Sequence, residues 1–593
     1  MPVDQWNLEQ FYPHPGHETL INDIDRAGAL LDQIEQALDT GPLDFSETYR
    51  TLHKARILAN NISYYLFCWT AIDHEHKSLD VTQNLSHELS AKQTRITEMI
   101  DKRFRQVSKN NQDAVLSVLA GDLKKELEFR LERQAFPSED YSCAFAMLES
   151  DGLKAFQSIR NGIARKFTAK IDFPSGARVV NASAIDECFN HTSAIVRKQF
   201  YRCWDDYYTN HQETLAKCLS AIIGWRIKEK TTRYQDSRLD LLHDAFYLQK
   251  TTQDTVETLR KHLSDFSPKV HEALGAMAQA CGKGQLEPED IWAPMIIPAP
   301  KMGHPMEWNL SQALEFIDES MSKVDPEFSN FLIYMQKNSL IEASQSTKKH
   351  PGAFCIHLPQ NRVPLVYCTF TGTIASVSTL AHELGHAYHY WICRDLSEGD
   401  PKYPMTLAET ASTFTEIIVC NHLIERFPDQ ELAIRWHQSA NFLSFAVNSM
   451  LRFDLEHWMN QTRISEPLTA DRLNQKTKDL WKLWYGSNIT EGDSRYWAKI
   501  SLFFFSHIEF YNYPYAVGYF IALALVQRQI KNSESFADFY RDFLHATPFE
   551  KVESLVLKNL GYSSISGFID EGLKTQEDIF DRLHKVCDKL EFH

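Results

Sequence analysis

The residues best suited to chemistry form a five-residue run, His382-Glu383-Leu384-Gly385-His386. On a helix, two histidines four positions apart project from one face, where both imidazoles can bind a single zinc ion. Glu383 would lie about 100° further round the helix, where its carboxylate can accept a proton from a water molecule at the metal. The spacing predicts a zinc centre that activates water for hydrolysis. The competing interpretation is a helix with two surface histidines.

A catalytic zinc centre of this kind needs a third protein ligand beside an open position for water. A third histidine further along the same segment is excluded, because His389 stands where that longer motif requires glycine and Ile392 where it requires histidine. Residues 407–416 have a helical pattern that places Glu409 and Glu416 on one face. We expect Glu409 to be the third ligand and Glu416 to orient a ligand histidine. Three ligands suffice, so no metal contact is expected from His389.

The sequence before the motif predicts the elements that must position it. Residues 353–358 and 363–370 are β-prone runs, and the turn residues between them predict a hairpin. Residues 371–373 then lead into an apolar stripe at helical spacing. This stripe is formed by Ile374, Val377, Leu380 and Ala381. We therefore expect a short sheet beside the motif-bearing helix.

Most of the remaining chain repeats apolar residues with a helical period, as residues 20–38 illustrate. Two breaks interrupt this pattern. Residues 174–176 have the composition of a turn, and residues 282–305 contain too many prolines for regular helix. The predicted fold class is mainly α, with a small β-sheet beside the motif helix.

The composition disfavours several other classes of protein. The chain has 593 residues and a formal net charge of −16, with 43% hydrophobic residues. Such a chain can bury a large apolar core, and its acidity argues against binding nucleic acid or an anionic membrane. The first residues lack a signal-peptide pattern, the eleven cysteines are scattered, and no apolar stretch reaches the roughly 18–20 residues that span a bilayer. We expect a soluble cytoplasmic protein, and the sequence does not indicate its oligomeric state.

Several of these segments resemble the M3 family of zinc peptidases, and most closely its oligoendopeptidase F branch. The resemblance is carried by Gly352-Ala353-Phe354-Cys355, Phe370-Thr371-Gly372-Thr373, the stretch from His382 to His389, Ala408-Glu409-Thr410-Ala411-Ser412-Thr413-Phe414, and the stretch from Phe510 to Tyr519. It implies a two-lobed, mainly helical body with a deep channel, one zinc ion per chain and short unstructured peptides as substrates. We expect an N-terminal helical domain over residues 1–190 and a catalytic domain over 191–593.

The resemblance also implies roles for individual residues. Zinc would be bound by His382, His386 and Glu409, with Glu383 as general base. A histidine and tyrosines from a late helix would stabilise the tetrahedral intermediate, and His507 with Tyr515 or Tyr519 is the favoured combination. Substrate contacts are expected from Gly352, Ala353, Phe354, Tyr511 and Tyr513.

The activity expected from these residues is endopeptidase cleavage of short peptides, and alternatives stay open. A carboxy-dipeptidase of the same family would need a cationic group for the terminal carboxylate, which the sequence does not place. A catalytically silent helical protein that binds peptides is a second alternative. An aminopeptidase is disfavoured, because the nearest equivalent of its amine-binding motif, at residues 275–279, lacks the required glutamate.

Overall fold

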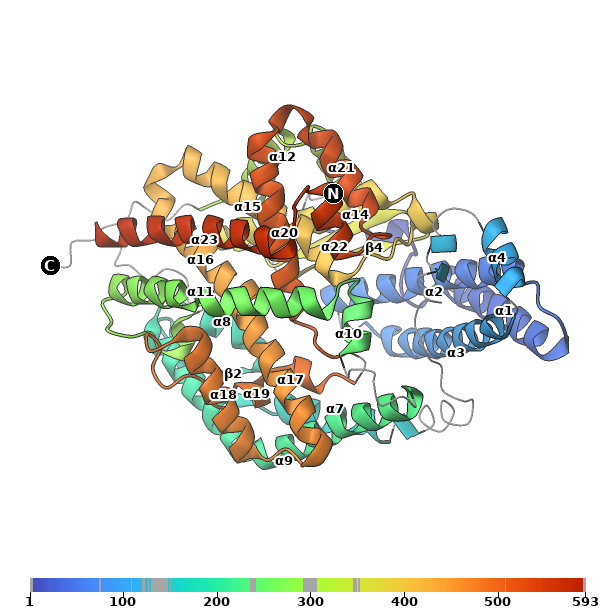
Figure 1. Cartoon of the computed structure of the whole chain (residues 1–593), viewed down its shortest axis with the longest axis horizontal. Coiled ribbons are helices and arrows are strands. Elements are labelled where there is room, and N and C mark those ends of the chain that lie inside the picture. Colours follow the sequence, from blue (N-terminus) through green and yellow to red (C-terminus); the bar gives the residue numbers. More distant parts are fainter. Residues whose placement is uncertain are drawn as a thin grey trace. The chain divides into compact units, whose positions relative to one another are not determined.

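The structure is a computed structural model of the chain (Figure 1). It describes residues 4–73, 76–107, 109–119, 123–125, 127–128, 148–149, 151–234, 242–291, 307–344, 349, 352–506 and 508–589. The chain divides into two compact units that interleave along the sequence. Unit 1 comprises Met1–Gln134, Glu307–Tyr403 and Asn532–Glu550, and unit 2 comprises Ala135–Met306, Pro404–Lys531 and Lys551–His593. The expected domain boundary at residue 190 stays a prediction.

Unit 1 combines long amphipathic helices with a small sheet. Its helices are α1 (Glu18–Thr40), α2 (Phe45–Ile72), α3 (Leu79–Gln106), α4 (Lys109–Val118), α12 (Leu310–Ser322), α13 (Glu327–Lys337), α14 (Ile374–Cys393) and α21 (Phe536–Ala546). The helices α1, α2 and α3 pack on one another. Leu20, Leu31 and Leu38 of α1 are all buried, so the helical period read from the sequence does mark the packed face of this helix.

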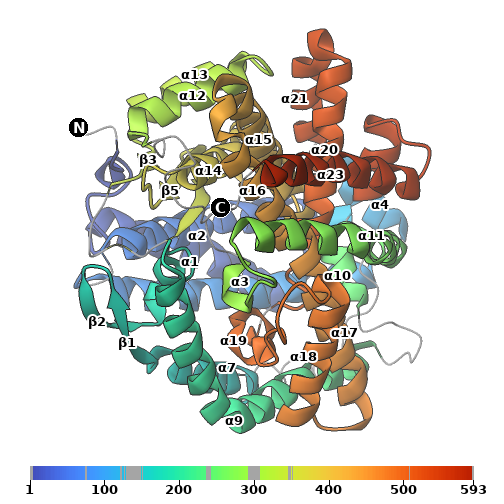
Figure 2. The same ribbon diagram turned by 90° about the vertical axis from the view of Figure 1, so that its left-hand side faces the viewer.

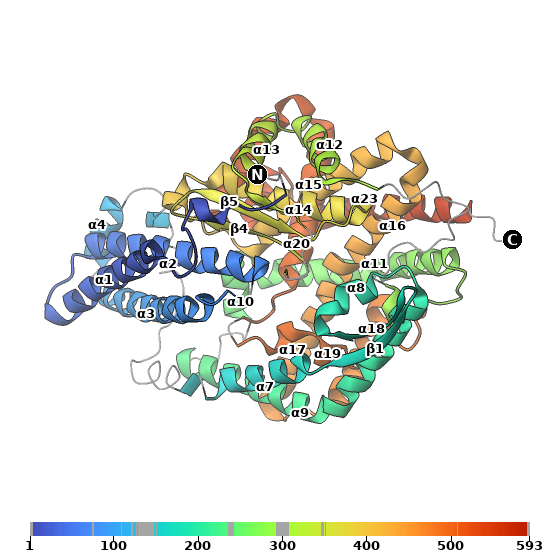
Figure 3. The same ribbon diagram turned by 180° about the vertical axis from the view of Figure 1, so that it is seen from behind.

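The sheet of unit 1 has the strand order β3-β5-β4, with β3 (Ile341–Glu342), β5 (Val363–Cys368) and β4 (Ala353–Leu358). The predicted hairpin is confirmed, because β4 and β5 pair antiparallel. All six residues of the central strand β5 are buried, whereas β4 at the edge is mostly half-exposed. Both strands pack against α14 (Figure 3), which confirms a small sheet beside the motif helix.

Unit 2 is also mainly helical. Its helices are α7 (Leu153–Arg165), α8 (Ile185–Phe189), α9 (Ala194–Tyr234), α10 (His243–Leu248), α11 (Gln253–Ala280), α15 (Met405–Arg426), α16 (Glu431–Phe442), α17 (Ser449–Ser465), α18 (Ala470–Tyr485), α19 (Tyr496–Lys499), α20 (Tyr513–Lys531), α22 (Val552–Ser554) and α23 (Ile565–Asp588). The most extensive packing joins α15 to α20, and α11 lies beside α23 (Figure 2). A hairpin of β1 (Thr168–Phe173) and β2 (Gly176–Asn181) turns at the predicted Pro174-Ser175-Gly176.

Two further expectations concern the described parts of the chain. The described part of the proline-rich stretch, residues 282–291, contains only a short 3-10 turn, Pro288–Asp290, and residues 292–305 lie outside the described residues. Within the described helices, none is both long and apolar enough to cross a bilayer. The mainly α fold class is confirmed, and the expected channel stays a prediction.

Candidate metal centre

The two motif histidines lie on α14, whose start is set by its own sequence. The Thr373 side chain caps the helix, because its Oγ1 accepts a hydrogen bond from the backbone N–H of Ser376 at 3.2 Å. The apolar stripe predicted from the sequence is buried at Val377, Leu380 and Ala381. The rings of His382 and His386 are half-buried, with centroids 4.9 Å apart. The helix thus holds two imidazoles at the spacing that one metal ion requires.

Glu383 follows the first histidine and is nearly buried, with 6% of its surface exposed. Burial and then the charge of Glu383 raise the pKa of the Cys355 thiol on β4. The same two causes raise the pKa of Cys368 on β5 to about 12. The buried carboxylate of Glu383 thus acts electrostatically on both strands of the hairpin.

Glu409 lies on α15, one turn after the start of that helix, and is 7% exposed. The Thr406 hydroxyl donates a hydrogen bond to the carbonyl oxygen of Gln249 at 2.9 Å, which fixes the first turn. Close packing against α20 also depends on Gly518. A Cβ atom at this glycine would lie 2.9 Å from the carbonyl oxygen of Thr406 and 3.0 Å from the Cβ of Glu409. Glycine is therefore required for the observed approach of the two helices at Glu409.

The expected ligand set has the chemistry of a metal centre. His382 and His386 in unit 1 present two half-buried imidazoles on α14, and Glu409 in unit 2 supplies a buried carboxylate. Two imidazole nitrogens and one carboxylate are a donor set that zinc accepts, and they leave a position for water. The residues present therefore fit a catalytic zinc ion, although the roles of the individual side chains stay predictions.

Glu416, expected to orient a ligand histidine, lies two turns further along α15. It accepts a hydrogen bond from the Asn441 side-chain amide, and its Oε1 lies 3.3 Å from Nε2 of His437. It also lines a small cavity with Tyr519 and others. These contacts hold the carboxylate against α16, and its expected role towards a ligand histidine stays a prediction.

The four late tyrosines fall into two classes. Tyr513 and Tyr519 on α20 are buried, and their hydroxyls donate hydrogen bonds to the carbonyl oxygen of Ala245 and to Oε1 of Gln576, both at 3.0 Å. Tyr511 and Tyr515 are half-exposed, and their hydroxyl oxygens lie 3.3 Å apart. The second pair is therefore better placed to meet a ligand. His507 lies outside the described residues.

The three expected substrate contacts at residues 352–354 lie at the sheet edge. Gly352 has a φ of +125°, and its backbone N–H donates to the Thr369 hydroxyl at 3.1 Å. Phe354 stacks on Tyr367, with ring centroids 4.8 Å apart. Among the described strands, β4 pairs with β5 alone. Its outer edge can accept an extended peptide as an added strand, and this use of Ala353 and its neighbours stays a prediction.

Comparison with known proteins decides the family. Residues 189–547, more than half of the chain, match the model of peptidase family M3. The chain belongs to peptidase family M3. The expected resemblance to the oligoendopeptidase F branch is also confirmed by the relatives and the fold.

Two relatives and one solved structure illustrate this M3 membership. Oligopeptidase PepF of Bacillus subtilis is 23% identical over 67% of this chain and 58% of its own length. The chromosomal oligoendopeptidase F of Lactococcus lactis is 23% identical over 66% of this chain and 64% of its own length. The match thus spans less than two thirds of either relative. The crystal structure of oligoendopeptidase F from Enterococcus faecium covers 96% of this chain and 99% of its own, with a TM-score of 0.69 at 16% identity, and shows the same M3 fold.

Sequence reasoning missed some residues that shape this M3 site. Gly518 interrupts an apolar helix, a signal of close backbone approach that went unused. His389 is fully buried, stacks on Tyr403 and hydrogen-bonds Thr547 at 2.7 Å, and burial lowers its pKa to about 3. Its side chain is thus a neutral part of the core at ordinary pH, and the expectation that it makes no metal contact stays a prediction.

Proposed function

We propose that this M3 chain is a zinc-dependent endopeptidase that hydrolyses internal bonds of short, unstructured oligopeptides. The single observation that carries the proposal is the pair of half-buried imidazoles that His382 and His386 present on α14, with Glu383 directly after the first histidine. The names of the relatives, an oligopeptidase and an oligoendopeptidase, support the substrate class. In this proposal His382, His386 and Glu409 bind one zinc ion.

Glu383 is the proposed general base. When bound, zinc supplies Lewis-acid activation of a water molecule and of the scissile carbonyl. The Glu383 carboxylate accepts the proton of the attacking water and then delivers that proton to the leaving amine. Its place directly after His382 supports this role, as does the packing of α14 against β4, to which a peptide could add as a strand.

A tyrosine hydroxyl is the proposed hydrogen-bond donor to the oxyanion that forms during attack. Tyr515 is preferred, with Tyr511 beside it, because both side chains are half-exposed, whereas Tyr513 and Tyr519 are buried. One preorganised donor of this kind contributes about 3–4 kcal/mol to catalysis. His507 keeps its expected place as a further donor from the same segment.

The same proposal places the enzyme in a reducing compartment, the cytoplasm. No disulfide joins any of the ten cysteines in the described part of the chain, as is usual for proteins kept in a reducing environment. Neither a nucleic acid nor a membrane is a proposed partner, since a formal net charge of −16 disfavours binding to phosphate-rich partners.

Internally quenched peptides with blocked ends provide the test. We expect cleavage at an internal bond, loss of cleavage with a chelator and recovery when zinc is added back. Cleavage only of peptides with a free carboxyl terminus would instead indicate a carboxy-dipeptidase, and peptide binding without turnover would indicate a silent binding protein. Glu409→Ala should lose bound zinc, and an unchanged zinc stoichiometry by metal analysis would refute the ligand assignment.

A further inference from the structure

Residues 505–512 link a 3-10 turn, Ser501–Phe504, to the start of α20 and carry Tyr511. The described residues of this segment, here called the tyrosine loop, form no regular helix or strand. The loop is nevertheless tied to α7, where the Gln157 side chain accepts a hydrogen bond from the backbone N–H of Ser506 at 2.9 Å, and to α9 and α17. The charges that hold it lie far away in the sequence.

Helix α9 holds the first half of the tyrosine loop. The Arg226 guanidinium donates hydrogen bonds to the carbonyl oxygen of Phe505 and, at 2.7 Å, to that of Ile508. One turn later, Lys230 forms an ion pair with Glu509. Arg226 is only 6% exposed, so its charge is committed to these backbone carbonyls rather than to solvent.

Helix α17 holds the second half. Oε1 of Glu456 accepts a hydrogen bond from the backbone N–H of Phe510 at 3.0 Å. This contact stabilises an uncommon conformation, since Phe510 has a φ of +52°. The Arg452 side chain donates to Oδ1 of Asn512 at 2.8 Å. Glu456 and Arg226 also face each other, with 3.9 Å between Oε1 and Nη1.

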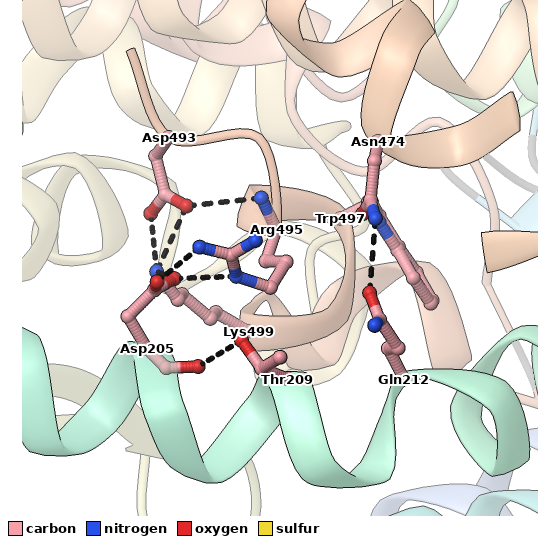
Figure 4. Close-up of polar contacts among 8 residues, drawn as sticks. All are labelled: Asp205, Thr209, Gln212, Asn474, Asp493, Arg495, Trp497 and Lys499. Carbon is pink, nitrogen blue, oxygen red and sulfur yellow. Dashed lines mark hydrogen bonds and ion pairs between the residues drawn. The ribbon is translucent and has the colours of Figure 1, made fainter. Parts of the chain in front are cut away.

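A second cluster, shown in Figure 4, anchors the chain just before the loop. Asp205 on α9 accepts from Nζ of Lys499 and from Nε of Arg495, both at 2.8 Å. Lys499 also binds Asp493 at 2.8 Å. The chain that enters the tyrosine loop is therefore fixed to the same helix that holds the loop itself.

The chemistry of these contacts indicates that they fix the position of the loop backbone. Burying a charged side chain costs free energy, and apolar side chains in its place usually stabilise a protein at least as well as a buried ion pair does. Here the buried guanidinium of Arg226 meets backbone carbonyls and the buried carboxyl group of Glu456 meets an N–H, and these contacts fix the positions of the backbone atoms. The side chain of Tyr511, in contrast, stays half-exposed, with its hydroxyl beside that of Tyr515. A rigid backbone that presents a half-exposed side chain is typical of a preorganised site.

We propose that Arg226 and Glu456 are positioning residues that hold the tyrosine loop so that Tyr511 acts, beside Tyr515, on the bound peptide. This inference rests on the proposed peptidase function. Arg226 acts by joining the carbonyls of Phe505 and Ile508, and Glu456 by accepting the N–H of Phe510. Neither side chain touches substrate itself.

A double-mutant cycle between Arg226→Met and Tyr511→Phe tests the inference. Small misplacements of a catalytic group reduce rates by up to about 100-fold, so we expect Arg226→Met to lower kcat about 10- to 100-fold, with zinc content and KM little changed. In the Tyr511→Phe variant, adding Arg226→Met should lower kcat by less than about threefold further, because the hydroxyl that Arg226 positions is already absent. If the fold losses in kcat of the two single variants multiplied in the double variant, the inference would be overturned.

A pair of variants at Glu456 repeats the test independently of whether Arg226→Met folds. Glu456→Gln keeps an oxygen that can accept the N–H of Phe510, whereas Glu456→Ala does not. We expect the glutamine variant to keep kcat within about threefold of wild type and the alanine variant to lose about tenfold or more. Equal kcat values for both variants would overturn the inference.

Arg260→Met is the matched control, because it removes an ion pair to Asp454 on the same helix α17 without touching the loop. Its kcat should stay near that of wild type, and a loss equal to that of Arg226→Met would overturn the inference. A wild-type protein that cleaves no peptide would overturn the proposed function and this inference together. An active wild type with the wrong mutant pattern would overturn this inference alone.

Discussion

The motif helix α14 and the tyrosine loop are both parts of the proposed site, and they are held in opposite ways. Packing on β4 and β5 and an apolar buried face hold α14. The loop is held by a buried guanidinium on α9 and a buried carboxyl group on α17, which hydrogen-bond its backbone. Apolar packing is insensitive to direction, whereas hydrogen bonds from fixed charges specify individual atoms. Metal ligands can thus rest on a regular element, but an irregular loop needs contacts that specify its backbone.

The largest effect should follow from a change on α14 that leaves its packing intact. Glu383→Gln keeps the shape of the side chain and removes the base, so kcat should fall by about 10³-fold or more. Because Glu383 is not a proposed ligand, zinc content should stay the same. Peptide cleavage measures kcat, and metal analysis of the same preparation measures zinc content. Full turnover in this variant would sink the assignment of the base.

A second large effect should arise where apolar packing positions the third ligand. Gly518→Ala would force a Cβ against Thr406 and Glu409. Overpacking of this kind typically costs about 1–3 kcal/mol, and we expect zinc affinity to fall about 10- to 100-fold, as it does when a ligand's support is lost. Competition with a zinc-binding dye measures the affinity.

The control for that variant is Gly28→Ala on α1, where the added Cβ would have no atom within 4 Å. Zinc affinity should stay unchanged there, and stability should stay equal or rise slightly, because alanine favours helix over glycine. Wild-type zinc affinity in Gly518→Ala would show that the position of Glu409 does not depend on this helix contact.

The two regions also differ in how far the sequence predicts them. The β4–β5 hairpin and α14 follow from local periodicity, because neighbouring residues decide which face is apolar. Once this helix is predicted, the four-residue spacing alone places His382 and His386 on one face of it. The small sheet beside that helix could be predicted for the same reason.

The support of the tyrosine loop could not be predicted, because it joins residues between 54 and 282 positions apart. Arg226 and Glu456 lie in helices, where charges ordinarily face solvent. Likewise, the tyrosines of residues 511–519 are equivalent in the sequence. Only tertiary contacts separate the buried Tyr513 and Tyr519 from the half-exposed Tyr511. The interleaved units, too, arise from non-local packing.

A smaller effect should appear in the pH dependence of stability. Burial raises the pKa of Glu456 to about 7, and Arg226, Glu509 and Lys230 are the charged groups that face it. The folded protein therefore holds a proton that the unfolded chain releases near pH 4.5, so this group's contribution to stability falls as pH rises from about 4.5 to about 7. In Glu456→Gln this loss should vanish, and the melting temperature of wild type relative to the variant should fall between pH 5 and 8.

Glu466→Gln serves as the control, since this exposed glutamate directly follows the same helix α17 and pairs with Arg472 at the surface. It should leave the pH dependence of the melting temperature as in wild type. A melting-temperature difference between wild type and Glu456→Gln that does not change with pH would contradict the buried protonation of Glu456.

The smallest effect should come from a polar contact in the region that apolar packing holds. Thr373→Ala removes the cap of α14, which should cost about 1 kcal/mol of stability, as should the matched cap variant Thr469→Ala on α18. Because the sheet and the buried face still hold α14, kcat and zinc content should stay within about twofold of wild type. Peptide-cleavage assays compare the kcat of Thr373→Ala with that of Arg226→Met. If loss of this cap reduced kcat as strongly as loss of Arg226, polar contacts would position both regions, and the distinction between them would fail.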